Sequence, residues 1–232
     1  MTQGNQIVNS ADQAIEFADP AVSQSDTVTG AHKAVVIGRG ATVRELTTAN
    51  VGRGILVSKG ARVTVESSQI TGQEIAVEVG PDAQISLVGV QNGALTTISG
   101  ARKGIVVSGT ADLRNVAIYD DYRVLVDSGG RATITTSSIV TKNKGVEAQG
   151  FNGRGRLELV SSDIRAPQPL IGSTLWEQHG TRLSTIPSWL AVAGALFVLL
   201  AALLHIGHRI FAPESQVRHR SSPAITPAES SA

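Results

Sequence analysis

The chain has 232 residues and carries 20 Lys and Arg against 19 Asp and Glu, so its formal net charge is +1. It contains no cysteine, which excludes a disulfide framework, a cysteine zinc site and thiol chemistry. The near-zero charge argues against a general nucleic-acid binder, and a hydrophobic content of 41% is too high for a disordered chain.

The composition changes sharply along the chain and divides it into five segments. Residues 1–32 are polar and mixed, residues 33–165 are rich in Val, Ile, Gly, Ser and Thr, and residues 166–185 have the Pro and Gly typical of a linker. An apolar run occupies residues 186–208, and a tail rich in Ser, Pro and Ala follows over residues 209–232. We expect one folded domain over 33–165, then a membrane segment and a disordered tail.

An internal repeat runs through residues 33–165. Each unit opens with an aliphatic residue, turns at a glycine-containing corner and continues with alternating apolar and polar residues, as in Arg-Val-Thr-Val at 62–65. The opening positions, about 20 residues apart in most units, are Val35, Ile55, Ile75, Ile105, Val124 and Val146. The residues that follow each corner are Val43, Val63, Ile85, Leu113 and Ile134, and the closing positions are Val51, Ile70, Val90, Ile118, Ile139 and Ile164.

The period of two predicts short strands, and stacking the units would bury aliphatic ladders that one unit cannot bury alone. We therefore predict an all-β fold, a right-handed parallel β-helix of about six coils over 33–165. Its N-terminal end needs a cover, because a terminal coil exposes an unpaired strand edge. Ser10 and Gln13 have the spacing of a capping box, so residues 10–18 form either a short helical cap or a polar loop.

One unit carries a resemblance to a known superfamily. The sequence Gly-Ile-Leu-Val-Ser-Lys-Gly-Ala-Arg-Val-Thr-Val-Glu-Ser-Ser-Gln-Ile at 54–70, echoed at 104–118, resembles the right-handed parallel β-helix superfamily of pectate lyase-like and polygalacturonase-like proteins. The resemblance covers residues 33–165. It implies the fold and carries no activity with it.

A membrane anchor is predicted near the C-terminus. Leu190 to Leu204 is an unbroken apolar run, and about 20 residues of helix span a bilayer. More basic residues follow this run than precede it, which predicts a cytoplasmic tail and an extracytoplasmic β-helix. Residues 1–30 show no apolar signal-peptide core, so two alternatives stay open. Either a signal lies outside this sequence, or the protein is tail-anchored with its β-helix in the cytoplasm.

One acidic cluster could support catalysis. Asp120 and Asp121 are adjacent, and Arg123 lies close by. Two neighbouring carboxylates could act as acid and base, because like charges push their pKa values apart. Consecutive strand residues point to opposite faces, however, so a solvated corner is the favoured interpretation. No motif indicates a metal or a cofactor, and we expect none of either.

Aligning the repeats reveals a basic column. Two positions before each opening residue stand Lys33, Arg53, Gln73, Lys103, Tyr122 and Lys144, with Arg123 beside Tyr122. Stacked coils lie about 4.8 Å apart, so these side chains would form an edge about 25 Å long. Such an edge could follow an anionic polymer, or it could simply keep the corner soluble and separate stacked edges.

Three functions are consistent with these features. The first is a non-catalytic, membrane-anchored β-helix of the cell envelope that binds an anionic polysaccharide or envelope protein partners. Its expected ligand-binding residues are Lys33, Arg53, Lys103, Arg123 and Lys144. The alternatives are a membrane-tethered polysaccharide lyase, hydrolase or epimerase, and a tail-anchored cytoplasmic scaffold that self-assembles. No nucleic-acid partner is expected.

Overall fold

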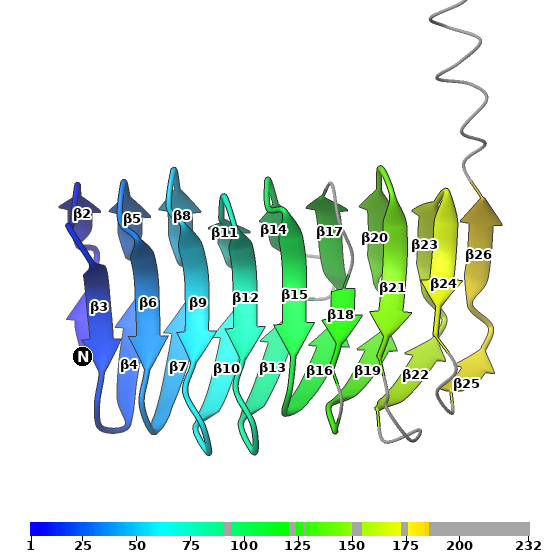
Figure 1. Cartoon of the computed structure of the whole chain (residues 1–232). Coiled ribbons are helices and arrows are strands. Elements are labelled where there is room, and N and C mark those ends of the chain that lie inside the picture. Colours follow the sequence, from blue (N-terminus) through cyan, green and yellow to red (C-terminus); the bar gives the residue numbers. More distant parts are fainter. Residues whose placement is uncertain (91–93, 121–123, 128, 150–154, 173–175, 186–232) are drawn as a thin grey trace, which may run out of the picture. The chain divides into compact units, whose positions relative to one another are not determined.

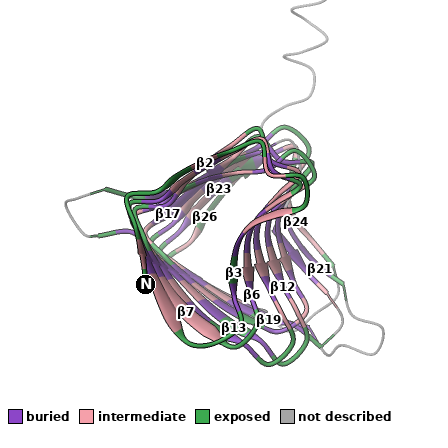
Figure 2. Ribbon diagram, turned by 90° about the vertical axis from the view of Figure 1, so that its left-hand side faces the viewer, coloured by how far each residue is buried: buried purple, intermediate pink, exposed green. Residues whose placement is uncertain are grey.

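The computed structural model describes residues 1–90, 94–120, 124–127, 129–149, 155–172 and 176–185. Within these residues the chain is a parallel β-solenoid of about eight turns without a helix. Each complete turn gives one strand to each of three parallel sheets (Figure 1). Figure 2, viewed along the solenoid, shows the buried positions around the central core. The predicted all-β parallel solenoid is confirmed.

The strands fall into three sheets, named A, B and C. Sheet A contains β1 (Thr2–Gln3), β4 (Ala21–Gln24), β7 (Gly40–Arg44), β10 (Arg62–Glu66), β13 (Gln84–Val88), β16 (Thr110–Arg114), β19 (Arg131–Thr135), β22 (Arg156–Val160) and β25 (Trp176–His179). Sheet B contains β2 (Gln6–Val8), β5 (Thr27–Thr29), β8 (Thr47–Ala49), β11 (Gln69–Thr71), β14 (Thr96–Ser99), β17 (Val116–Asp120), β20 (Ser138–Thr141), β23 (Asp163–Ala166) and β26 (Arg182–Thr185). Sheet C contains β3 (Gln13–Phe17), β6 (Lys33–Ile37), β9 (Arg53–Val57), β12 (Ile75–Val79), β15 (Lys103–Val107), β18 (Val124–Val126), β21 (Lys144–Ala148) and β24 (Gln168–Ile171).

Aliphatic ladders fill the core because inward residues of successive coils pair in register. The ladder of sheet C is Ile15, Val35, Ile55, Val77, Ile105, Val124 and Val146. The ladder of sheet B includes Ile70, Ile98, Ile118, Ile139 and Ile164. All of these side chains are buried, and each fully buried aliphatic side chain stabilises the fold by about 1.5–3 kcal/mol.

The corner between sheets A and B turns on one residue in the left-handed conformation. The non-glycine residues at this corner are Ser25, Glu45, Ser67, Asn115, Thr136 and Ser161, with φ between 47° and 56°. The next residue in the chain is buried, and in three coils it is a serine. The hydroxyls of Ser68, Ser137 and Ser162 accept hydrogen bonds from backbone amides of the preceding coil at 3.1–3.2 Å. These bonds offset part of the left-handed strain.

The register differs from the prediction in several coils. Val77, rather than Ile75, pairs with Ile55 and Ile105, and Ile75 belongs to an outward column. In sheet A, Val65 pairs with Val43 and with Leu87, so the predicted Val63 and Ile85 lie two residues out of place. A slip of two residues preserves the alternation of inward and outward side chains, which is why the pattern did not reveal it.

The closing ladder also differs from the prediction at two positions. Val90 is 52% exposed, and Ile98 pairs with Ile70 and Ile118 in its place. Val51 is buried but lies outside the strands of sheet B. Both residues sit at corners, where spacing changes from coil to coil.

The predicted count of six coils is wrong, because the solenoid continues at both ends of residues 33–165. Neither a helix nor a loop occupies residues 13–17; they form β3, and Ile15 and Phe17 pair with Val35 and Ile37. The Ser10 hydroxyl donates to the carbonyl of Gln13 at 2.8 Å. Residues 166–185, expected to be a linker, contribute β24, β25 and β26.

The predicted membrane segment at 186–208, including Leu190 to Leu204, and the tail at 209–232 lie outside the described residues. Within the part of the chain that the structure describes, no helix has the length and apolar character needed to cross a membrane.

Candidate functional site

The structure places the predicted basic residues in one outward column of sheet C, with one change. Lys33 pairs with Arg53, and the next two positions are Ile75 and Lys103. Ile75 therefore occupies the place predicted for Gln73. Lys144 belongs to the same column through the pairing of strands β15, β18 and β21. Tyr122 and Arg123 lie outside the described residues.

Three of these four basic side chains are already in ion pairs. Lys33 Nζ lies 3.2 Å from a carboxylate oxygen of Asp12. Arg53 Nη1 lies 2.8 Å from Glu78, and Lys144 Nζ lies 3.2 Å from Glu147. Lys103 is exposed and has no ion-pair partner among the described residues. Along this edge a polyanion would compete with carboxylates that are already in place.

Asp120, the described member of the candidate catalytic cluster, has a structural role. Its side chain is buried, and one carboxylate oxygen accepts a hydrogen bond of 3.0 Å from the backbone amide of Ala101. The other oxygen lies against Gly104, where a Cβ would collide with it. Asp120 thus fastens the end of β17 to the neighbouring coil. Asp121 and Arg123 lie outside the described residues.

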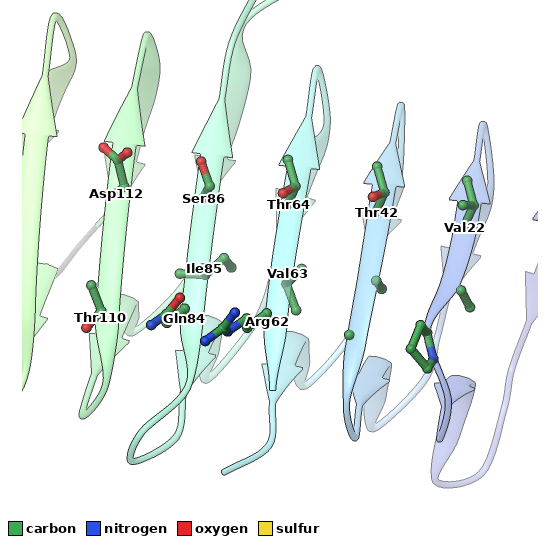
Figure 3. Close-up of a pocket in the computed structure, with 14 residues that line it drawn as sticks. Val22, Thr42, Arg62, Val63, Thr64, Gln84, Ile85, Ser86, Thr110 and Asp112 are labelled. Atoms are coloured by element: carbon green, nitrogen blue, oxygen red, sulfur yellow. The ribbon is translucent and has the colours of Figure 1, made fainter. Parts of the chain in front are cut away.

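A groove of about 750 Å³ runs along the outer face of sheet A (Figure 3). Two outward rows of residues line it, each following the solenoid axis from strand to strand. The first row holds Val22, Thr42, Thr64, Ser86 and Asp112. The second row holds Gly40, Arg62, Gln84 and Thr110. Between the rows, the inward Val63 and Ile85 anchor the strands to the core.

The groove offers polar groups that the protein itself does not use. The hydroxyls of Thr42, Thr64 and Ser86 make no hydrogen bond with any described residue, and the same holds for the side chains of Arg62 and Gln84. Asp112 is different, because its carboxylate accepts from Arg114 Nη2 at 2.6 Å. Many of the lining side chains are small, and Gly40, which pairs with Arg62, has no side chain to narrow the groove. The arrangement is an open groove whose hydroxyl, amide and guanidinium groups make no hydrogen bond with the described residues.

The sequence contains a signal for this groove that the prediction did not use. The alternation at 62–65 and 84–87 already identifies Arg62, Thr64, Gln84 and Ser86 as outward residues. The repeat spacing does not give the correct register across four coils. Only that register aligns Thr42, Thr64 and Ser86 in a single row.

Comparisons with known protein families, with curated proteins and with solved structures found no match. The assignment of a function therefore depends on the surfaces of this molecule alone.

Proposed function

We propose that this protein is a non-catalytic binding module that contacts an extended polysaccharide along the outer face of sheet A. The observation that carries the proposal is the groove itself. It crosses β4, β7, β10, β13 and β16, and on β7 to β16 it presents unused hydroxyl, amide and guanidinium groups. In the same proposal, the apolar run from Leu190 to Leu204 holds the module at a membrane of the cell envelope.

The direction of the groove favours a polymer over a small molecule. Both rows run perpendicular to the strands, and successive strands lie about 4.8 Å apart. A polymer lying in this direction meets a hydroxyl group on three successive strands, those of Thr42, Thr64 and Ser86. Hydroxyls and amides both donate and accept hydrogen bonds, which suits the hydroxyl groups of a sugar chain.

The other candidate surfaces have less to offer a ligand. On sheet C, Lys33, Arg53 and Lys144 already satisfy neighbouring carboxylates. The carboxylate of Asp120 is buried and fixed to a backbone amide, which favours a binding module over the membrane-tethered enzyme. The groove on sheet A combines access with unused hydrogen-bonding groups.

The test uses the full chain in non-ionic detergent and a panel of immobilised neutral and acidic polysaccharides. We expect the wild type to retain at least one polysaccharide without releasing shorter products. Thr64→Trp fills the centre of the groove and should weaken that binding by about tenfold or more, since an ill-fitting side chain removes several contacts at once. Thr97→Trp places the same ring on the outer face of sheet B and should bind as the wild type does.

Two results would overturn the proposal. One is a wild-type protein that retains no polysaccharide of the panel. The other is a Thr64→Trp variant that binds as tightly as Thr97→Trp while both variants melt at the wild-type temperature.

A further inference from the structure

The second row of the groove continues beyond it as a column of arginines. Strand pairing places Arg62 beside Gln84, then Thr110, and then Arg131 and Arg156. All five side chains of this column are exposed. Sheet A thus carries three outward guanidinium groups in one line parallel to the solenoid axis.

These three arginines differ from the other arginines of sheet A because they form no ion pair with a described residue. Arg44 lies 2.9 Å from Glu66, and Arg114 lies 2.6 Å from Asp112. Arg62, Arg131 and Arg156 have no carboxylate partner among the described residues. The other lysines and arginines of the described part that lack a partner are Arg102, Lys103 and Arg182. Half of the free cations therefore fall in one column, and that column borders the groove.

We propose that Arg62, Arg131 and Arg156 bind carboxylate groups of an acidic polysaccharide that lies along sheet A. This inference rests on the proposed function and names the chemical class of its ligand. A guanidinium group presents a planar fork of donors that matches a carboxylate, and an unpaired one loses no existing ion pair on binding. The site is separate from the column of Lys33, Arg53, Lys103 and Lys144, which lies on sheet C.

The spacing of the arginines defines the charge pattern of the ligand. Arg131 and Arg156 lie on adjacent strands, about 4.8 Å apart, whereas Arg62 lies three strands from Arg131, a distance of about 14 Å. Between them stand the uncharged Gln84 and Thr110. A ligand that pairs with all three arginines therefore presents carboxylates at these spacings, and its hydroxyl groups face Gln84 and Thr110.

Nucleic acid does not fit this surface. Its phosphate charges are dense, about one per 1.7 Å of duplex axis. These phosphates would be repelled by Asp112 and Glu158, which lie in the neighbouring row of sheet A. Strands β4 to β22 of sheet A contain no aromatic side chain on which a base could stack. A polysaccharide with spaced carboxylates meets fewer like charges and needs no stacking platform.

The experiment compares polygalacturonate with its fully methyl-esterified form, which keeps the sugar backbone and removes the charge. The full chain in non-ionic detergent is tested as the wild type and as two triple variants. The column variant combines Arg62→Gln, Arg131→Gln and Arg156→Gln. The matched control combines Arg102→Gln, Lys103→Gln and Arg182→Gln, and removes the same number of free positive charges elsewhere.

We expect the wild type to bind polygalacturonate about tenfold more tightly than the ester at low salt, with affinity falling as salt rises. The column variant should lose about tenfold in affinity and most of the salt dependence. The matched control should stay within about twofold of the wild type. Thermal melting of both variants checks that the solenoid is intact.

The outcomes separate the two proposals. If both triple variants lose affinity equally, net charge drives binding and the arginine column is not the site. If the wild type binds the ester as tightly as the acid, or binds a single-stranded oligonucleotide more tightly than either, the inference is wrong. Binding of the neutral ester would still support the proposed function. If the wild type binds no polysaccharide at all, the proposed function itself fails.

Discussion

Asp26 joins the first turn of the solenoid to the second by accepting two hydrogen bonds from Asn5. The backbone amide of Asn5 donates at 2.8 Å and its side-chain amide at 3.0 Å. The Ser23 hydroxyl donates to the other carboxylate oxygen at 2.7 Å. Burial alone would raise the pKa of Asp26, but the hydrogen bonds from Ser23 and Asn5, with the Thr2 hydroxyl nearby, lower this pKa below the ordinary value of 3.8.

This lowered pKa predicts acid-sensitive attachment of the first turn. The folded pKa lies below the unfolded value, so the stabilisation is fully present above pH 3.8 and is lost as the pH falls through the folded pKa. The protection factors of the β2 amides against hydrogen exchange should therefore fall in strong acid before the central strands open. In Asp26→Asn, exchange in β2 should be faster at neutral pH and should lack that acid step. An acid step of the same size in Asp26→Asn would rule out this explanation.

The corrected register predicts unequal effects for two neighbouring aliphatic residues. Val77 is fully buried in the ladder, and its truncation to alanine should lower the free energy of unfolding by about 2 kcal/mol. Ile75 is half-buried on the outer face, and Ile75→Ala should cost less than about 1 kcal/mol although it removes more atoms. Chemical denaturation of the two variants measures both values. The reverse order would restore the register first read from the repeat spacing.

The left-handed corner predicts a stabilising substitution. Thr136 has φ of 50°, a conformation that is costly for a β-branched residue. Asparagine tolerates this conformation better, so Thr136→Asn should raise the free energy of unfolding by about 0.5–1 kcal/mol. Thr135→Asn, one residue earlier in β19, serves as a control and should give no gain. Equal melting temperatures for Thr136→Asn and the wild type would show that the corner is not strained.

The contact between Asp120 and Gly104 predicts strong coupling between these two positions. Gly104→Ala places a Cβ against the Asp120 carboxylate and should cost about 1–3 kcal/mol. Asp120→Ala leaves the buried amide of Ala101 without its acceptor, at a similar cost. In the double variant the collision is absent. Its loss of unfolding free energy should therefore be smaller than the sum of the two single losses by about 1 kcal/mol or more. Additive costs in a double-mutant cycle would disprove the contact.

Much of the core could be predicted from the sequence, because period-two alternation of β-branched residues determines which side chains face inward. Val35, Ile55 and Ile105 lie in the ladder as predicted. The alternation leaves a slip of two residues open, so the repeat spacing alone predicts Ile75 where the ladder holds Val77. At the N-terminus, Ser10 and Gln13 have the spacing of a helix capping box but do not begin a helix. The alternation of Ile15 and Phe17 is that of a strand.

The candidate site was harder to predict, because a cation is free or paired according to neighbours that are distant in sequence. Glu78 lies 25 residues beyond Arg53, and the two meet only when the coils stack. The same stacking gives Arg44 a partner in Glu66, 22 residues further along the chain, and leaves Arg62 without a carboxylate partner among the described residues. The sequence indicated where basic side chains point outward. It did not indicate which of these side chains lack an ion-pair partner and are available to a ligand.

The most direct measurement of the central claim is arginine-specific chemical labelling of the full chain, with and without polygalacturonate, read residue by residue by mass spectrometry. The account predicts that the polymer protects Arg62, Arg131 and Arg156, while Arg102 and Arg182 stay as reactive as in the free protein. Protection of Arg102 and Arg182 instead, or equal protection of all five residues, would contradict a binding face on sheet A.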